Sequence, residues 1–369
     1  MQVSEAIAGS VALAFPREVG QHPGLVKGEI MRRNRTVPRG QVHRLTHVSK
    51  ALEGNLLGDP TERELHVYTP HGYKEGARLP LLVDVVGFTG SGMGHTNWKA
   101  FTENVPERLD RLIGEGKMGP VVVAFPDCYS RLGGNQYINS AAIGRYEDYL
   151  IEEIVPLVEG RFSAGGQGNR GIFGKSSGGF GAITHGLRHG GFWAALACHS
   201  GDMAFELCYL HDMPKALNEL AKHDRSIEKF MAHLEVSPKP TEDEITTVMI
   251  LAMAATYDPD PTCFLGVRLP VDLYTAELIE ERWRNWLAWD PALTVDKYAD
   301  NLRKLKGIYI DCGERDQFTL HYGSRRMHRA LERLGIAHVY EEFPDDHTAV
   351  DYRMDKSLPF LEKALRGTA

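Results

Sequence analysis

Residues 170–182 read RGIFGKSSGGFGA, and they hold the most informative pattern in the chain. Residues 171–173 are typical of the end of a short buried strand, and residues 178–187 of the start of a helix. Residues 174–178 (GKSSG) form the turn between them, so the G-x-S-x-G pattern stands in a strand–turn–helix context. Such a sharp reversal strains the backbone at its centre and leaves room only for small residues two positions to either side. We therefore expect one serine hydroxyl to stand above the end of a sheet.

Two neighbouring serines compete for the centre of this turn. Ser176 has Gly174 and Gly178 two positions away, whereas Ser177 has Lys175 behind it, where a long side chain would clash. The helix that follows would point free N–H groups and the positive end of its dipole toward the exposed oxygen. We expect Ser176 at the tip of the turn and keep Ser177 as the alternative.

Other glycine-rich motifs fit the chain poorly. A Walker A phosphate loop needs a glycine five positions before the Gly-Lys pair, where this chain has Asn169. Residues 90–95 (GSGMGH) fail as a dinucleotide fingerprint, because His95 stands where the third glycine belongs. A glycine-rich turn without chemistry stays open on the motif alone, since G-x-S-x-G also occurs by chance.

Strands and helices alternate around the turn. Residues 80–86 (PLLVDVV) and 120–125 (PVVVAF) are continuous apolar runs, which is typical of strands covered on both faces, and residues 101–113 have a helical pattern. Strand, helix and strand at this spacing indicate a right-handed crossover and a parallel sheet. Three segments with strand-like alternation are expected to open the sheet as antiparallel strands: residues 24–36, 41–49 and 64–69.

A long helix-rich segment, residues 203–300, interrupts this alternation. The sheet pattern resumes at residues 307–312 (GIYIDC) and 337–343 (AHVYEEF). We expect residues 1–202 and 301–369 to form one core domain of the α/β class, with a mostly parallel sheet and helices on both faces. Residues 203–300 are expected to be an inserted helical cap over the carboxyl ends of the strands.

A serine hydroxyl becomes a nucleophile when a base lies within hydrogen-bond distance and an acid orients that base. In an open parallel sheet such groups gather at the carboxyl ends of the strands. Asp316 follows the strand at 307–312, and His347 follows the strand at 337–343, in the chain order serine, acid, histidine. We expect Ser176, Asp316 and His347 to form a catalytic triad.

Three other carboxylates compete with Asp316 for the role of the acid. Glu314 lies in the same turn, Asp311 lies inside the preceding strand, and Asp202 follows the strand before the insertion. Each of them could instead be a turn former or a helix cap. Among the 16 histidines, His347 is the one expected in a loop after a late strand.

Acyl transfer also needs donors for the negative charge that develops on the carbonyl oxygen. We expect one donor to be the backbone N–H of Ser177, at the start of the helix. The second is expected from the glycine-rich loop after residues 80–86, where the N–H of Phe88, next to Gly87, is the first choice.

Several segments of the chain resemble the esterase D, antigen 85 and enterochelin esterase group of the α/β-hydrolases. The similar segments are residues 55–68, 133–149 (GGNQYINSAAIGRYEDY), 173–182 (FGKSSGGFGA), 199–206 (HSGDMAFE), the Asp290-Pro291 region, 310–316 (IDCGERD) and 345–361 (DDHTAVDYRMDKSLPFL). The resemblance implies an α/β-hydrolase fold and a triad that matches Ser176, Asp316 and His347. It also implies that the loop with Gly133, Gly134, Tyr137 and Asn139 lies near the catalytic site. The insertion at 203–300 is a departure from the simplest members of the group.

The residues around the reacting atoms are harder to assign, because aromatic clusters are usually plain core. Six residues are candidates for the substrate pocket: Gly87, Trp98, Tyr137, Asn139, Trp283 and Trp286.

Composition limits the partners. The net charge of −7 argues against nucleic acid or an anionic membrane as the main partner. The five cysteines are scattered without a C-x-x-C pair, which favours a reduced cytosol over a disulfide framework or a zinc site.

The apolar run at residues 7–15 is short and follows Glu5 rather than a basic residue, so we expect no signal peptide and a cytoplasmic location. Residues 258–261 (DPDP) lack further oxygen ligands, and we expect no metal.

Together these features predict a serine carboxylesterase that needs no cofactor and cleaves small-molecule esters with short-chain or small aromatic acyl groups. An acyltransferase, a thioesterase of the S-formylglutathione type and a non-catalytic scaffold of the same fold are the alternatives. Whether the chain forms a homo-oligomer stays open.

Overall fold

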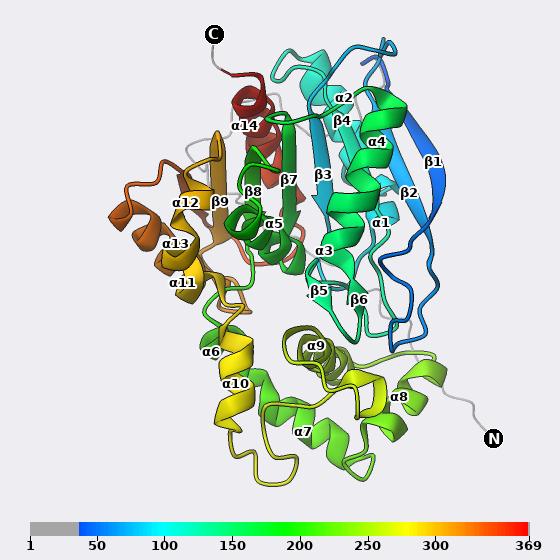
Figure 1. Ribbon diagram of the computed structural model, residues 1–369, viewed down its shortest axis with the longest axis vertical. Helices are drawn as coiled ribbons and strands as arrows, with labels where there is room; N and C mark the ends of the chain where they lie inside the picture. Colours follow the sequence, from blue (N-terminus) through cyan, green and yellow to red (C-terminus); the bar gives the residue numbers. More distant parts are fainter. Residues whose placement is uncertain (1–36, 368–369) are drawn as a thin grey trace, which may run out of the picture. The chain divides into compact units, whose positions relative to one another are not determined.

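The computed structural model describes residues 37–367, whose centre is an eight-stranded sheet in the order β1-β2-β4-β3-β7-β8-β9-β10 (Figure 1). The strands are β1 (Gln41–Val48), β2 (Glu62–Thr69), β3 (Leu81–Val85), β4 (Val122–Pro126), β7 (Arg170–Lys175), β8 (Ala195–His199), β9 (Gly307–Gly313) and β10 (Val339–Phe343). β1 and β2 pair antiparallel, as do β2 and β4, while the pairs from β4 to β10 are parallel. The expected fold class is confirmed. The strand expected at residues 24–36 lies outside the described residues.

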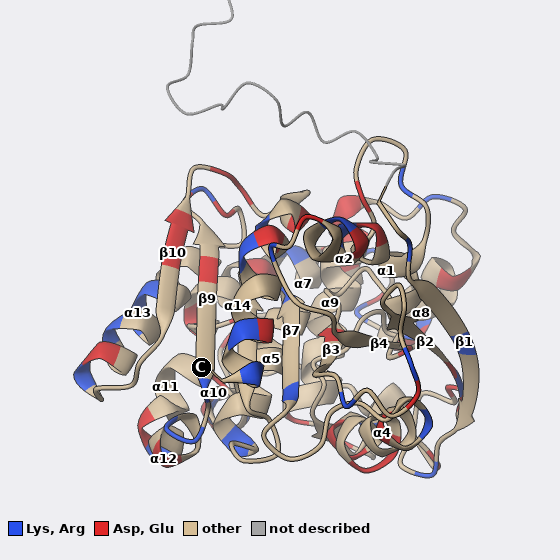
Figure 2. Ribbon diagram, turned by 90° about the horizontal axis from the view of Figure 1, so that it is seen from above, with Lys and Arg blue, Asp and Glu red and all other residues tan. Residues whose placement is uncertain are grey.

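Helices cover both faces of the sheet because the strands are apolar on both sides. α4 (Val155–Phe162) and α5 (Ser177–Arg188) share one apolar core with Val83, Ile172 and Leu196. The alternate strand residues point the other way, into a second core with α2 (Val105–Gly114) and α14 (Met354–Arg366). Figure 2 shows α2 and α4 on opposite sides of the sheet.

The parallel strands end almost level with one another. Lys175 of β7 lies opposite His199 of β8, which in turn lies opposite Asp311 of β9. Gly174 lies opposite Val85 of β3. The loops that follow β3, β7, β8, β9 and β10 therefore start from the same edge, where α/β sheets hold their ligands.

Residues 203–300 lie between β8 and β9 in the chain and fold into helices and loops. The α-helices are α6 (Phe205–Cys208), α7 (Met213–Ala221), α8 (Ile227–Val236), α9 (Glu242–Tyr257), α10 (Glu280–Leu287), α11 (Pro291–Thr294) and α12 (Ala299–Leu302), the last of which continues past residue 300. Figure 1 shows α7 to α10 grouped beyond one end of the sheet. α9 starts at a capping box formed by Thr241 and Glu244, which explains its sharp beginning. That this segment acts as a separate cap domain stays a prediction.

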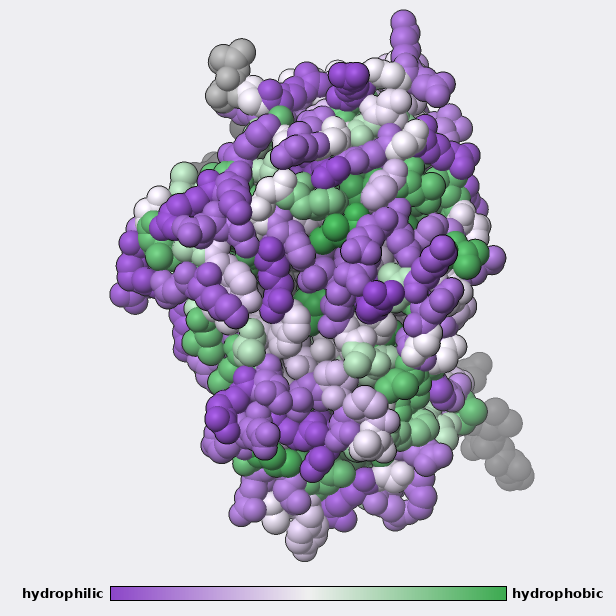
Figure 3. All heavy atoms as spheres, in the orientation of Figure 1, coloured by the Kyte–Doolittle hydropathy of each residue, from purple (hydrophilic) through white to green (hydrophobic). Residues whose placement is uncertain are grey.

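Hydrophilic residues cover most of the face drawn in Figure 3, with apolar residues scattered among them. Within residues 37–367, no helix has the length and apolar character that crossing a membrane requires.

Candidate active site

Ser176 stands at a strained strand-to-helix turn, as the sequence predicts. It lies between the end of β7 and the first residue of α5, with φ 59° and ψ −126°. A Cβ on Gly174 would lie 2.0 Å from the carbonyl oxygen of Val85, and a Cβ on Gly178 would lie 1.8 Å from it. Both glycines are therefore required because the turn packs directly against the end of β3.

The neighbouring strand fixes the height of this turn. The N–H of Ser176 donates a hydrogen bond of 2.9 Å to the carbonyl oxygen of His199, at the end of β8. His199 is itself held in the interior, where its ring contacts Asp311 at 2.6 Å and Ser357 at 2.8 Å. Packed strands rather than a mobile loop therefore position the serine.

The predicted acid, Asp316, and the predicted base, His347, contact each other. Nδ1 of His347 and Oδ2 of Asp316 are 2.7 Å apart, and both side chains are buried. The second oxygen of Asp316 accepts the N–H of Phe318 at 2.9 Å. Burial by itself raises the pKa of Asp316, but the hydrogen bond and charge of His347, together with the backbone N–H groups of Phe318 and Leu320, hold this pKa below its ordinary value. Asp316 is therefore an ionised acceptor, which leaves Nε2 of His347 for a reacting group.

The competing acids have other partners. Glu314 is exposed, and Asp311 binds His199 and Arg353 in the interior. Asp202 accepts hydrogen bonds from Tyr209 and Gln136. The geometry at His347 thus favours Asp316.

Ser176 and His347 line one pocket of about 230 Å³, without a direct hydrogen bond between them. Such bonds are often formed only when a substrate is bound. The lining comes from the loops after β3, β7 and β8, from the start of α5, from α6 and α9, and from the regions after β9 and β10. The residues are Gly87, Phe88, Thr89, Lys175, Ser176, Ser177, Asp202, Cys208, Tyr209, Glu242, Ile245, Thr246, Met249, Phe318, Leu320 and His347.

The loop after β3 faces the serine. Gly134 donates its N–H to the carbonyl oxygen of Phe88 at 2.6 Å, and a Cβ on Gly134 would lie 2.3 Å from that oxygen. Gly90 donates to Gly87 at 3.0 Å. These contacts hold the backbone around Phe88 opposite the start of α5, where Ser177 begins the helix.

Lys175 connects the turn to the histidine loop. Its ammonium donates a hydrogen bond of 3.2 Å to the carbonyl oxygen of His347. Burial lowers the pKa of Lys175, with opposing contributions from the nearby carboxylates Asp351 and Asp316. The sequence motif predicts the position of Lys175 in the turn but not its contact with the loop that holds His347.

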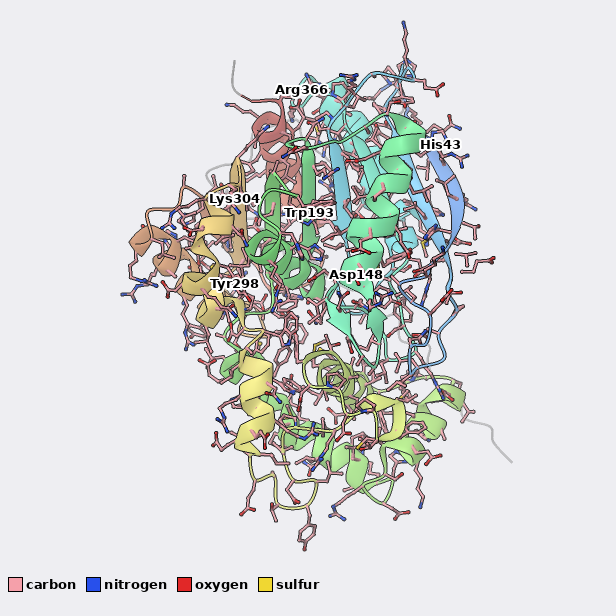
Figure 4. The ribbon with its side chains drawn as sticks, in the orientation of Figure 1. His43, Asp148, Trp193, Tyr298, Lys304 and Arg366 are labelled. Carbon is pink, nitrogen blue, oxygen red and sulfur yellow. The ribbon has the colours of Figure 1, made fainter. Side chains whose placement is uncertain are left out.

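Gly87 is the one member of the predicted six-residue pocket that lines the cavity described here. Trp98 is 67% exposed, and Tyr137 is buried behind the site, where its hydroxyl donates to Val86 at 2.6 Å. Asn139 binds Asp148, which is labelled in Figure 4, at 2.7 Å.

The two tryptophans of α10 pack within the insertion. Trp283 and Trp286 have ring centres 5.7 Å apart, and Trp286 packs against Tyr209 and Tyr257. In their place α9 supplies Glu242, Ile245, Thr246 and Met249 to the pocket. No sequence pattern indicated which helix of the insertion would face the serine.

The site also lacks a metal cluster as far as the described residues go: no group of three His, Cys, Asp or Glu side chains within 37–367 could hold an ion.

The model of the Esterase family, described as "Putative esterase", matches residues 59–355. The chain belongs to this family, which confirms the expected enzyme class, an ester hydrolase. A search of curated proteins gave no match.

Solved structures with the same fold carry related names. A ferulic acid esterase is 18% identical with a TM-score of 0.57, and the match covers 88% of this chain and 99% of that one. S-Formylglutathione hydrolase (FrmB) from Staphylococcus aureus is 16% identical with a TM-score of 0.53, covering 88% and 100%. S-Formylglutathione hydrolase from Agrobacterium tumefaciens is 17% identical with a TM-score of 0.54, covering 88% and 96%. At these identities the likeness establishes the α/β-hydrolase fold.

Proposed function

We propose that the protein hydrolyses carboxylic esters through an acyl-enzyme, with Ser176 as nucleophile, His347 as general base and acid, and Asp316 as the group that orients His347. One observation carries the proposal. The 2.7 Å contact between Asp316 and Nδ1 of His347 leaves Nε2 as the free nitrogen of a ring that lines the same pocket as the strained Ser176.

In the proposed reaction, the Ser176 oxygen attacks the ester carbonyl while Nε2 of His347 takes the hydroxyl proton. The carbonyl oxygen becomes negative and accepts hydrogen bonds from the backbone N–H groups of Ser177 and Phe88. His347 then returns the proton to the departing alcohol, and the acyl group stays on Ser176. Water, deprotonated by His347, attacks this ester, and the acid leaves as the serine recovers its proton.

The pocket supports small acyl groups. Its volume of about 230 Å³ and its apolar side chains, among them Ile245, Met249, Phe318 and Leu320, suit a short-chain or small aromatic acyl group. The name of one structural neighbour, a ferulic acid esterase, agrees with an aromatic acyl group.

A thioester is the second candidate substrate, because two structural neighbours are named S-formylglutathione hydrolases. Transfer of the acyl group to an alcohol and a non-catalytic role remain alternatives. The absence of a cofactor, a cytoplasmic location and partners limited to small-molecule esters remain predictions.

The test is hydrolysis of p-nitrophenyl esters of increasing acyl length, with S-formylglutathione as a further substrate. Ser176→Ala is expected to lower kcat by about 10³-fold or more at unchanged circular dichroism. Ser177→Ala is the matched control, since it keeps the backbone N–H and is expected to retain most activity. An active Ser176→Ala variant would make Ser177 the nucleophile instead. A wild type that cleaves no ester and no thioester would favour the scaffold.

A further inference from the structure

Asp202 is a buried carboxylate that the proposed reaction does not use. It follows β8, lines the pocket beside Ser176 and Ser177, and is 7% exposed. A second acid, Asp316, already orients His347, and no hydrogen bond joins Asp202 to that ring. Its presence in the wall of the pocket therefore needs another explanation.

The two oxygens of Asp202 differ in their surroundings. Oδ2 accepts a hydrogen bond from the Tyr209 hydroxyl at 2.9 Å and one from Nε2 of Gln136 at 3.2 Å. Within residues 37–367, Oδ1 accepts no hydrogen bond and Asp202 has no ion-pair partner. Oδ1 is not among the fully buried polar atoms that lack a partner, so it faces the pocket, and an occupant without a donor would leave it unpaired at a cost in free energy.

The surrounding residues fix this orientation. Nε2 of Gln136 also lies 2.9 Å from the hydroxyl oxygen of Ser177, so the amide is anchored at the start of α5. Tyr209 is buried among aromatic rings and also contacts the Tyr257 hydroxyl at 3.0 Å. Oδ2 is therefore held on the protein side, and Oδ1 is the oxygen left for the pocket. Burial, the largest of several influences, raises the pKa of Asp202 to about 6, which agrees with a carboxylate short of donors.

We propose that Asp202 determines substrate specificity: its Oδ1 accepts a hydrogen bond from a hydroxyl or ammonium group on the ester that occupies the pocket. The inference rests on the proposed ester hydrolysis and adds the chemical class of the substrate, an ester with a hydrogen-bond donor. A site built to accept such a bond discriminates strongly against an analogue that lacks the donor, because the buried acceptor is then left unpaired.

The test uses pairs of p-nitrophenyl esters in which a hydroxyl or ammonium group in one member takes the place of a methyl group in the other. One pair is the 3-hydroxybutyrate and the 3-methylbutyrate, a second is the 3-(4-hydroxyphenyl)propanoate and the 3-(4-methylphenyl)propanoate, and a third is the β-alaninate and the butyrate. For the wild type we expect kcat/KM to favour the donor member of at least one pair by about tenfold or more. The pair that responds distinguishes an aliphatic hydroxyl, a phenol and an ammonium.

Asp202→Asn gives the sharpest comparison. Tyr209 and Gln136 would hold the amide oxygen, so the NH₂ group would face the pocket and could no longer accept. The donor preference is then expected to fall at least tenfold or to reverse, while a merely structural Asp202 would leave the ratio unchanged. Asp290→Asn is the matched control, because Asp290 is a buried carboxylate like Asp202 but lies in the insertion and accepts backbone N–H groups outside the pocket. Its variant is expected to keep the wild-type ratio.

Asp202→Ala, which removes the acceptor without adding a donor, is expected to bring the ratio to about one, and it serves if Asp202→Asn does not fold. Equal kcat/KM values within every pair for an active wild type would overturn the role of Asp202 and leave the proposed hydrolysis intact. No hydrolysis of any ester would overturn both.

Discussion

At the scale of single residues, the shape of the turn at Ser176 depends on two missing methyl groups. The carbonyl oxygen of Val85 occupies the space where a side chain on Gly174 or Gly178 would start. The requirement that the motif suggests, small residues on both sides of the serine, thus has a specific cause. The cause is that the turn lies in van der Waals contact with the end of β3.

Gly178→Ala is therefore expected to displace the start of α5 from β3. The added Cβ would lie 1.8 Å from the Val85 oxygen. Such overpacking typically lowers the free energy of unfolding by about 1–3 kcal/mol or more, and we expect most of the activity to be lost as well. Gly160→Ala in α4 is the control, since no atom lies within 4 Å of the position that the added methyl group would take, and it is expected to stabilise by about 0.5–1 kcal/mol. Urea unfolding and ester hydrolysis measure both. Equal effects of the two substitutions would contradict the packing argument.

Asp202 is expected to lower the stability of the fold at neutral pH. Because burial raises its pKa from 3.8 to about 6, the folded protein holds this proton more tightly than the unfolded chain does. The destabilisation is absent below about pH 4, grows up to about pH 6 and is complete above it.

Asp202→Asn is consequently expected to raise the free energy of unfolding at pH 7.5 by up to ~3 kcal/mol, at about 1.36 kcal/mol for each pKa unit, and by much less at pH 4.5. Urea unfolding at the two pH values measures the difference. A variant whose stability relative to the wild type is the same at both values would contradict the assignment of a raised pKa to this carboxyl.

At the scale of elements, α9 contributes more to the pocket than any other helix of the insertion. Its residues Glu242, Ile245, Thr246 and Met249 follow one another at helical spacing, so one face of α9 points toward Ser176. The strands determine where the serine stands, and α9 limits the space in front of it.

Met249→Ala is expected to shift the preferred acyl chain toward longer esters, because it removes side-chain volume from the wall of the pocket. Val248→Ala is the control on the same helix, since Val248 is buried but lies outside the pocket lining. It is expected to reduce stability without changing the chain-length profile. The measurement is kcat/KM for p-nitrophenyl esters from acetate to decanoate. An unchanged profile in Met249→Ala would show that α9 does not limit the acyl group.

At the scale of the whole molecule, the sheet and the three residues of the proposed triad could be predicted from the sequence, whereas the wall of the pocket could not. The parallel strands and the residues at their ends, Ser176, Asp316 and His347, follow local rules of strand, turn and loop, and the structure brings these three together. The pocket wall does not follow such rules, because it depends on how residues 203–300 pack against the sheet. Trp283 and Trp286 lie close together in the sequence, which suggests an aromatic pocket. Their rings instead pack against each other in the interior of the insertion.

The role of Asp202 illustrates the same difference. In the sequence it is one of three competing acids, and its position after a strand suits a catalytic acid as well as a turn. Only the hydrogen-bond partners separate the two acids: Tyr209 and Gln136 bind one oxygen of Asp202, whereas Asp316 binds His347. Hydrogen bonds between distant segments of the chain cannot be read from spacing along it.

The most direct test of Ser176 as the nucleophile is labelling with a fluorophosphonate, followed by mass spectrometry of the modified peptide. We expect one phosphonyl group per chain, on Ser176, no labelling of Ser176→Ala, and labelling slowed by about 100-fold or more in His347→Ala, which lacks the base. A folded wild type that is not labelled, or one labelled at Ser177, would contradict the claim that Ser176 is the activated nucleophile.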